Sequence, residues 1–100
     1  MTRYQYLKVP GRKNPATISY EVTTNPHDSS LMMVVGVALC HDKDNFSKVM
    51  GRQIADGRRL KSPHYVAFTE LDTSVSFGKR IVSSIHSWFS SEWKNLVQDP

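Results

Sequence analysis

The sequence contains a single cysteine, Cys40, among its 100 residues, so it cannot form an internal disulfide. A chain without disulfides is typical of a reducing compartment, and we expect the cytoplasm. The longest apolar run, residues 31–40, is about half as long as the ~20 residues that a membrane-spanning helix needs. The N-terminal residues also lack the apolar centre of a signal peptide. We therefore expect a protein that remains where it is made and has no membrane partner.

The signatures of catalysis and of cofactor binding are missing as well. The sequence has no GxxxxGK(S/T) loop, no GxGxxG turn and no HExxH helix. Cys40 and His41 cannot act as a nucleophile and its base, because neighbouring side chains on a strand point to opposite faces. Residues 40–44, CHDKD, hold several potential metal ligands, but a zinc site needs a second group of ligands and the other histidines are scattered. We expect no enzymatic activity, no metal and no cofactor.

What the sequence does have is an excess of positive charge. It contains 13 Lys and Arg against 9 Asp and Glu, a net charge of +4, and the excess lies in residues 1–30 and 41–62. Such a charge favours an anionic partner: a phosphate, a nucleotide, a nucleic acid or an acidic protein surface. The apolar fraction of 39% and the charged fraction of 22% are typical of a folded domain. A chain of this length holds one hydrophobic core, so residues 1–100 should form a single domain.

The first part of the chain has the pattern of three strands. Residues 4–9 and 16–22 are rich in β-forming residues, and the turn sequence PGRKNP between them predicts a hairpin with a basic tip. A second turn, residues 24–30, leads into a strand over 31–40. Both faces of this last strand are apolar, which predicts a central position in the sheet with both faces covered.

Within the strand over 31–40, one face narrows to small residues. Gly36 and Ala38 lie on this face, and they should let a helix or another chain approach the backbone closely.

A helix is predicted over residues 44–60, with Asp42 or Asp44 as its N-cap. Helical periodicity places one group of residues on an apolar side, which we expect to pack on the sheet. Gly57 on that side should either allow close contact or begin to end the helix. Gly51 falls near the edge of that side. The opposite side is a basic row that should face outward. The apolar side consists of Phe46, Val49, Met50, Ile54 and Gly57, and the basic row of Lys48, Arg52 and Arg59.

The rest of the chain predicts a strand over 64–71 and a long helix over 76–97, with N-cap candidates in DTSVS. The resulting fold is α+β: an antiparallel four-stranded sheet in the order β-β-β-α-β-α, with two helices packed on it. The long helix carries a row of large rings that fits either the core or, in part, a dimer face. These rings are Phe77, Trp88, Phe89 and Trp93.

The candidate ligand-binding residues are the basic row, its neighbour Arg58 and the basic hairpin tip. Arginine offers two parallel N–H groups to a phosphate, and Gly51 would let an anion approach the backbone. The alternative is an ordinary charged helix surface that binds nothing. The full candidate set is Lys48, Arg52, Arg58, Arg59, Gly51, Arg12 and Lys13.

Residues 35–60 resemble a pattern found in small bacteriophage proteins, in which an apolar strand leads into D-x-F-S and then G-R-x-I-A-x-G-R. The matching positions are Asp44, Phe46, Ser47, Gly51, Arg52, Ile54, Ala55, Gly57 and Arg58. The resemblance implies a phage-encoded protein that acts on a host system in the bacterial cytoplasm, in host takeover or in anti-defence. Some phage proteins of this size sequester cyclic nucleotide signals at oligomer interfaces, and others bind host proteins or DNA.

Two functions are therefore expected. The first is a non-enzymatic protein that binds a phosphate-bearing ligand, a host signalling nucleotide or a nucleic acid, through the basic helix face. It predicts that Arg52→Ala and Arg59→Ala lower binding without lowering the melting temperature. The second is an inhibitor or adaptor of a host protein that uses the aromatic C-terminal helix or a sheet edge. Either could act as a homo-oligomer.

Overall fold

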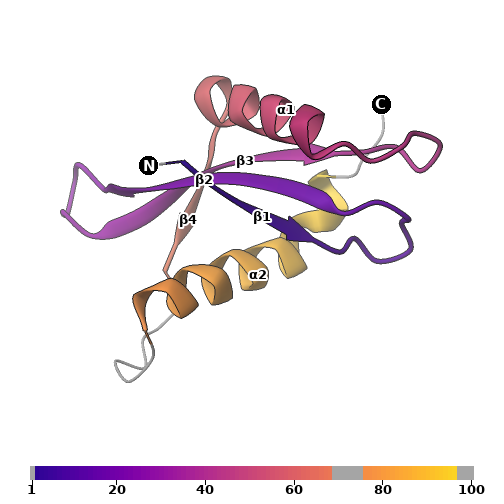
Figure 1. The fold of residues 1–100 in the computed structure, drawn as a ribbon. Helices are drawn as coiled ribbons and strands as arrows, with labels where there is room; N and C mark the ends of the chain where they lie inside the picture. Colours follow the sequence, from indigo (N-terminus) through magenta and orange to yellow (C-terminus); the bar gives the residue numbers. More distant parts are fainter. Residues whose placement is uncertain (1, 69–75, 97–100) are drawn as a thin grey trace.

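The computed structural model describes residues 2–68 and 76–96, which form one antiparallel sheet of four strands and two helices (Figure 1). The strands are ordered β1-β2-β3-β4 across the sheet. The predicted α+β fold and its order β-β-β-α-β-α are therefore confirmed. The elements are β1 (Arg3–Leu7), β2 (Ala16–Thr24), β3 (Leu31–Leu39), α1 (Lys48–Lys61), β4 (His64–Ala67) and α2 (Phe77–Leu96).

Most predicted boundaries agree with these elements to within a few residues. β1 ends at Leu7 instead of residue 9, and α1 begins at Lys48 instead of residue 44. β4 ends at Ala67, and residues 69–71 of the predicted strand lie outside the described residues, as does residue 97 of the predicted last helix.

The two faces of the sheet have different chemistry because of the register between β2 and β3. Ile18 lies opposite Val37 and Tyr20 opposite Val35, so large apolar side chains gather on one face. The other face carries small or polar pairs, Thr17 with Ala38 and Ser19 with Gly36. This difference determines which helix each face can accept.

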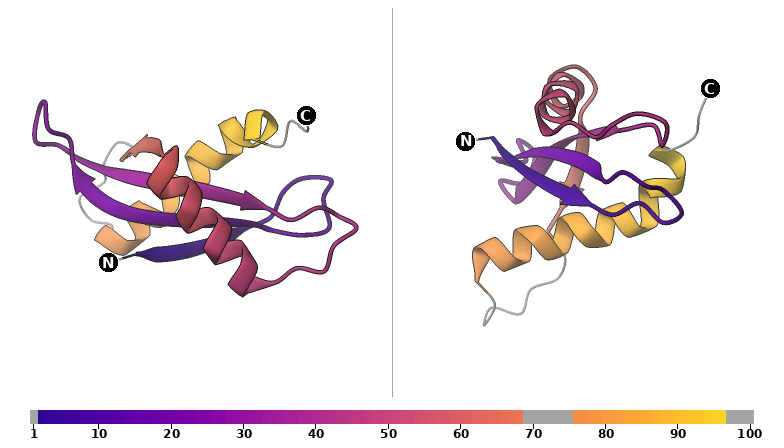
Figure 2. Two further views of the ribbon diagram at one scale, coloured as in Figure 1. Left: turned by 90° about the horizontal axis from the view of Figure 1, so that it is seen from above. Right: turned by 45° about the vertical axis from the view of Figure 1, so that its right-hand side comes forward.

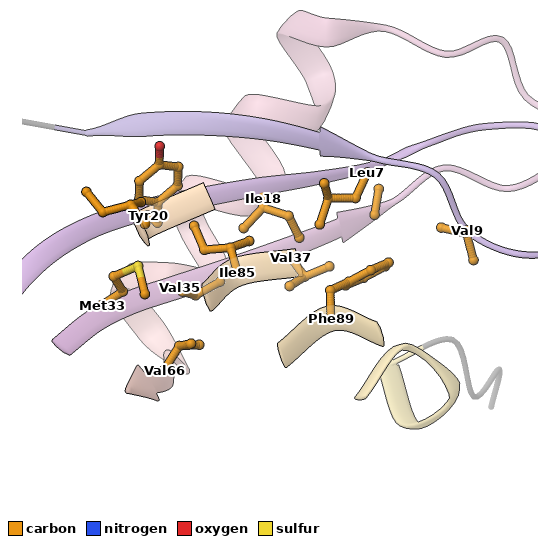
Figure 3. Close-up of a cluster of buried hydrophobic side chains, with 12 residues drawn as sticks. Leu7, Val9, Ile18, Tyr20, Met33, Val35, Val37, Val66, Ile85 and Phe89 are labelled. Carbon is orange, nitrogen blue, oxygen red and sulfur yellow. The ribbon is translucent and has the colours of Figure 1, made fainter. Parts of the chain in front are cut away.

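The apolar face is covered by α2. Its residues Ile81, Ile85 and Phe89 are buried in the hydrophobic core. Figure 3 shows Ile85 and Phe89 among the apolar side chains of the sheet. At the start of this helix the hydroxyl of Ser76 accepts a hydrogen bond from Lys79 N–H at 3.4 Å, as the predicted N-cap segment requires. Of the aromatic row, Phe89 is in the core, Trp88 and Trp93 are partly buried against it, and Phe77 is exposed. The row is therefore mainly core.

Helix α1 lies on the opposite face of the sheet from α2 (Figure 2). Its N-cap is Ser47, whose hydroxyl accepts a hydrogen bond from Met50 N–H at 3.3 Å. The prediction of Asp42 or Asp44 as N-cap is wrong. Both belong to the preceding loop, where the Asp42 carboxylate accepts from Lys13 N–H and the Asp44 carbonyl accepts from the amide of Asn14.

The predicted orientation of α1 is also wrong: the helix is turned the other way. Ala55 and Arg59 are buried against the sheet, while the apolar side, from Val49 to Leu60, faces outward. The sheet face beneath α1 explains this, because Gly36 has no side chain and the backbone at Ala55 and Arg59 comes directly over it. Large apolar side chains at that position would hold the helix away from the sheet. The expectation that Gly36 permits close approach of a helix is confirmed.

Replacing Gly51 or Gly57 with alanine tests this orientation within one helix. A Cβ at Gly51 would lie 2.5 Å from Thr17 Oγ1, whereas a Cβ at Gly57 meets nothing within 4 Å among the described residues beyond its own helix. We expect Gly51→Ala to lower the free energy of unfolding by about 1–3 kcal/mol through overpacking. Gly57→Ala should raise it by about 0.5–1 kcal/mol, because alanine favours a helix. Urea unfolding measures both, and the reverse ranking would contradict the orientation.

Candidate functional site

A layer of polar side chains lies between α1 and the sheet, with Arg59 at its centre. Arg59 is 9% exposed. Its Nε donates to Ser19 Oγ at 3.1 Å, its Nη1 donates to Glu21 Oε2 at 2.9 Å, and its Nη2 donates to Thr2 Oγ1 at 3.3 Å. All five N–H groups of a guanidinium need partners when it is buried, and these contacts supply several of them. Arg59 therefore holds α1 to β2 and does not face outward.

Asp56 completes this layer. Its carboxylate accepts from Ser19 Oγ at 2.5 Å and from Tyr4 OH at 2.7 Å, and it lies 3.9 Å from Arg59 Nη2. The hydrogen bond to Asp56, followed by burial, raises the pKa of the Tyr4 phenol above its ordinary value of 10.0. The phenol is thus kept neutral, as a hydrogen-bond donor to a carboxylate must be. These contacts make Asp56 and Tyr4 part of the helix–sheet contact.

The position of Arg59 removes the basis for expecting that Arg59→Ala would leave the melting temperature unchanged. We expect Arg59→Met to lower the free energy of unfolding by about 2 kcal/mol, because the carboxylates of Asp56 and Glu21 lose their cation while remaining partly exposed to solvent. Lys61→Met, an exposed position in the last turn of the same helix, should change it by less than about 0.5 kcal/mol. Thermal and urea unfolding give both values. An Arg59→Met variant with an unchanged free energy of unfolding would show that this polar layer contributes little to the stability of the fold.

Two of the candidate cations do come together, over the ring of Tyr6. Lys48 Nζ lies 5.1 Å from the ring centroid and the guanidinium carbon of Arg52 lies 5.8 Å from it. Arg52 also stacks on Tyr4 at 5.0 Å, and its Nε donates to Tyr6 OH at 2.6 Å. Within residues 2–68 and 76–96 neither cation has a carboxylate partner. We call Tyr4, Tyr6, Lys48 and Arg52 the cation–tyrosine cluster.

The remaining candidate residues lie apart from this cluster. Arg58 points to the other side of the helix, where its Nη1 donates to the carbonyl of Val37 at 2.8 Å and it lines a cavity with Ser62 and His64. Arg12 and Lys13 are in the loop between β1 and β2, where Lys13 N–H bonds to the carboxylate of Asp42. Gly51, which was expected to let an anion approach the backbone, instead faces Thr17 of the sheet. The seven candidates therefore do not form one surface.

The most conspicuous surface is the side of α1 that we expected to be buried. Its large side chains are 43–72% exposed. An added Cβ at Gly57, in the middle of this side, meets open space. Contiguous apolar side chains on a surface are typical of an interaction site, because water contacts them unfavourably. We call this side the α1 outer face, and it consists of Val49 (64% exposed), Met50 (56%), Ile54 (43%), Gly57 and Leu60 (72%).

Sequence reasoning found the residues of the α1 outer face but assigned them to the core. The signal that could have corrected this is in β2, where Thr17, Ser19 and Glu21 alternate with apolar residues. A polar sheet face needs a helix with a small or polar side. Helix α1 offers such a side through Gly51 and Ala55.

Other kinds of site find little support in the described part of the chain. No three His, Cys, Asp or Glu side chains gather there as metal ligands would. Neither α1 nor α2 is both long and apolar enough to span a bilayer. Comparison with protein-family models, with curated proteins and with solved structures finds no match to this chain.

Proposed function

We propose that this protein is a non-enzymatic binding domain that docks on another protein through the α1 outer face. The single observation that supports this proposal is the orientation of α1, which directs Val49, Met50, Ile54 and Leu60 into solvent. Burying a large aliphatic side chain contributes about 1.5–3 kcal/mol, so such side chains on one helix can supply the apolar centre of an interface. The proposal keeps the expected class of protein–protein inhibitor or adaptor and moves its contact surface from α2 to α1.

The charges around the α1 outer face indicate the chemistry of the partner. Lys48, Arg52, Arg58 and Lys61 are exposed cations on the same helix. The only acidic residue of α1, Asp56, is turned toward Ser19 and Tyr4. A partner with an apolar centre and an acidic rim therefore complements this surface in both respects.

A second copy of the chain fits less well. In a symmetric dimer each α1 would meet the same cations of its partner helix, and like charges at an interface are unfavourable. We therefore assign the α1 outer face to a different, acidic protein. If the resemblance to phage proteins is followed, that protein belongs to the bacterial host.

The test uses a photoreactive amino acid at Gln53, an exposed position on α1 between Val49 and Gly57. We expect it to cross-link a protein with an acidic surface in cells, and Leu60→Glu to abolish the cross-link, because a carboxylate repels an acidic rim and removes apolar contact. Leu31→Glu, an exposed leucine on β3, should leave the cross-link intact. Mass spectrometry identifies the product.

Capture that survives Leu60→Glu, or that is lost equally with Leu31→Glu, would contradict the proposal. Sedimentation of the purified chain tests whether the α1 outer face instead joins two copies of this protein. A dimer that dissociates on Leu60→Glu would assign the α1 outer face to a second copy and overturn the assignment to an acidic partner.

A second candidate function is binding of a phosphate-bearing ligand, a nucleotide or a nucleic acid, at the cation–tyrosine cluster. The observation that favours it is the convergence of Lys48 and Arg52, without carboxylate partners among the described residues, over the ring of Tyr6. Cations beside aromatic rings suit a phosphate next to a stacked base. Arg58, Arg59, Arg12 and Lys13 have no part in this narrower site.

This candidate predicts that the double variant Lys48→Met, Arg52→Met weakens binding of AMP or of a single-stranded oligonucleotide by at least about tenfold, since each charged hydrogen bond contributes about 1.5–3 kcal/mol. The control with the same loss of charge is Lys8→Met, Lys43→Met, at two exposed positions outside α1. Calorimetry at two salt concentrations separates the ligands, because nucleic-acid affinity falls steeply with salt. Equal loss in both double variants would mean that only net charge matters.

A further inference from the structure

β1 forms one edge of the sheet, because only β2 pairs with it. The direction of its backbone groups follows from the turn after β2, where the N–H of Asn25 donates to the carbonyl of Ser30 and so faces β3. Backbone groups alternate in direction along a strand, so the backbone of Ile18 faces β1, where its partner is Gln5. The backbone of Gln5 is therefore the one that points into the sheet.

The residues on either side of Gln5 direct their backbone groups out of the edge. Tyr4 and Tyr6 each present one N–H and one C=O there, and no described residue bonds to these four groups. A row of unpaired backbone groups along an edge strand is what another extended chain pairs with when it joins a sheet. The left view of Figure 2 shows β1 at the margin of the sheet, with the first turn of α1 reaching past it.

The cation–tyrosine cluster lies over this same edge. Lys48 Nζ lies 5.1 Å from the ring of Tyr6, and the guanidinium carbon of Arg52 lies 5.0 Å from the ring of Tyr4. In an added strand, the side chains opposite the two tyrosines would emerge on the same side of the sheet, beside these cations. Both cations are exposed, and neither has a carboxylate partner in residues 2–68 and 76–96. Carboxylates at alternate positions of the added strand would match them.

Two other occupants fit this edge less well. Pairing of β1 with β1 of a second copy would bring Lys48 and Arg52 of both chains together, and like charges at an interface are unfavourable. A nucleotide would use the cations but leave the outward backbone groups of Tyr4 and Tyr6 unpaired. An acidic extended chain satisfies both sets of groups.

We infer that β1 accepts an acidic extended segment as an additional antiparallel strand, with carboxylates at every second residue beside Lys48 and Arg52. An antiparallel strand continues the pattern of the sheet and pairs slightly more stably than a parallel one. Main-chain hydrogen bonds would supply affinity and the alternate carboxylates specificity. The segment belongs to the acidic protein that docks on the α1 outer face, so the inference rests on the proposed function for its source.

Capped peptides test this edge without the partner. We expect acetyl-TEVEVT-amide to slow hydrogen exchange of the Tyr4 and Tyr6 amides. It should bind at least about threefold more tightly than acetyl-TEEVVT-amide, which has the same composition but directs only one carboxylate toward α1. Chemical-shift titration measures both affinities. Equal affinities, or binding of acetyl-TEVEVT-amide without protection of these two amides, would overturn the inference, and so would the absence of binding.

N-methylated forms of acetyl-TEVEVT-amide separate strand addition from simple attraction of charges. In the inferred arrangement the N–H groups of both glutamates point to β1, and that of the valine between them points away. Methylation of both glutamate nitrogens should weaken binding at least about tenfold, because two hydrogen bonds are lost. Methylation of that valine nitrogen should change the affinity by less than about twofold. Equal effects of the two modifications would contradict strand addition.

Variants of the protein test the role of the cations. Lys48→Met, Arg52→Met should remove the preference for acetyl-TEVEVT-amide, whereas Lys43→Met, Lys61→Met, an equal loss of charge at exposed positions, should keep it. The opposite result would overturn the inference. Binding of AMP but of neither peptide would overturn it too, and would assign the cation–tyrosine cluster to a nucleotide.

Leu60→Glu separates this inference from the proposed function. Leu60 lies about 18 Å along α1 from Lys48, which is beyond the distance at which exposed charges interact at physiological salt. Peptide binding should therefore be unchanged in this variant. Failure of the Gln53 cross-link alongside intact peptide binding would contradict the proposed function and leave the β1 edge as a site for acidic strands.

Discussion

The close approach of α1 to β3 is the constraint on which the rest of the structure depends. Gly36 lets the helix backbone at Ala55 and Arg59 come directly onto the strand. At such a distance only small or hydrogen-bonding side chains fit between helix and sheet, so glycine, alanine, arginine and aspartate fill the contact. The large aliphatic residues of α1 have no position left except the outside. The exposed apolar surface thus follows from the packing on the other side of the helix.

The two helices therefore stabilise the sheet by different physical means. Helix α2 buries Ile85 and Phe89 against an apolar face, which is the usual hydrophobic contact. Helix α1 is held by backbone proximity and by the network from Arg59 to Glu21 and Ser19. Ion pairs between a buried guanidinium and partly exposed carboxylates contribute little net stability, but the hydrogen bonds of Arg59 need a defined geometry and so favour one placement of the helix.

The sequence predicts the order of the elements because strand and helix periodicities differ clearly in residues 16–22, 31–40 and 44–60. It does not predict the direction of α1, because an amphipathic pattern identifies an apolar side without identifying what covers it. The pattern of charged residues along the chain likewise does not show which cations come together in the fold. Lys48 and Arg52 meet over Tyr6 only because β1 lies beside β2, which places residues far apart in sequence under one helix. The cavity between the first turns of α1 and the end of β3 leaves no pattern in the sequence, since its wall combines β2, β3, α1 and the loop that precedes α1.

The short length of β4 has a consequence for the edge of the sheet. β4 pairs with β3 only from Met32 to Val35, so in the described part of the chain residues 36–39 extend beyond it. A bare stretch of strand is a template on which other extended chains can add and aggregate. Here the guanidinium of Arg58 donates a hydrogen bond to the carbonyl oxygen of Val37. A single arginine side chain thus supplies a hydrogen bond that a neighbouring strand would otherwise make. This disfavours the addition of another chain at this edge of the sheet, although β4 is short.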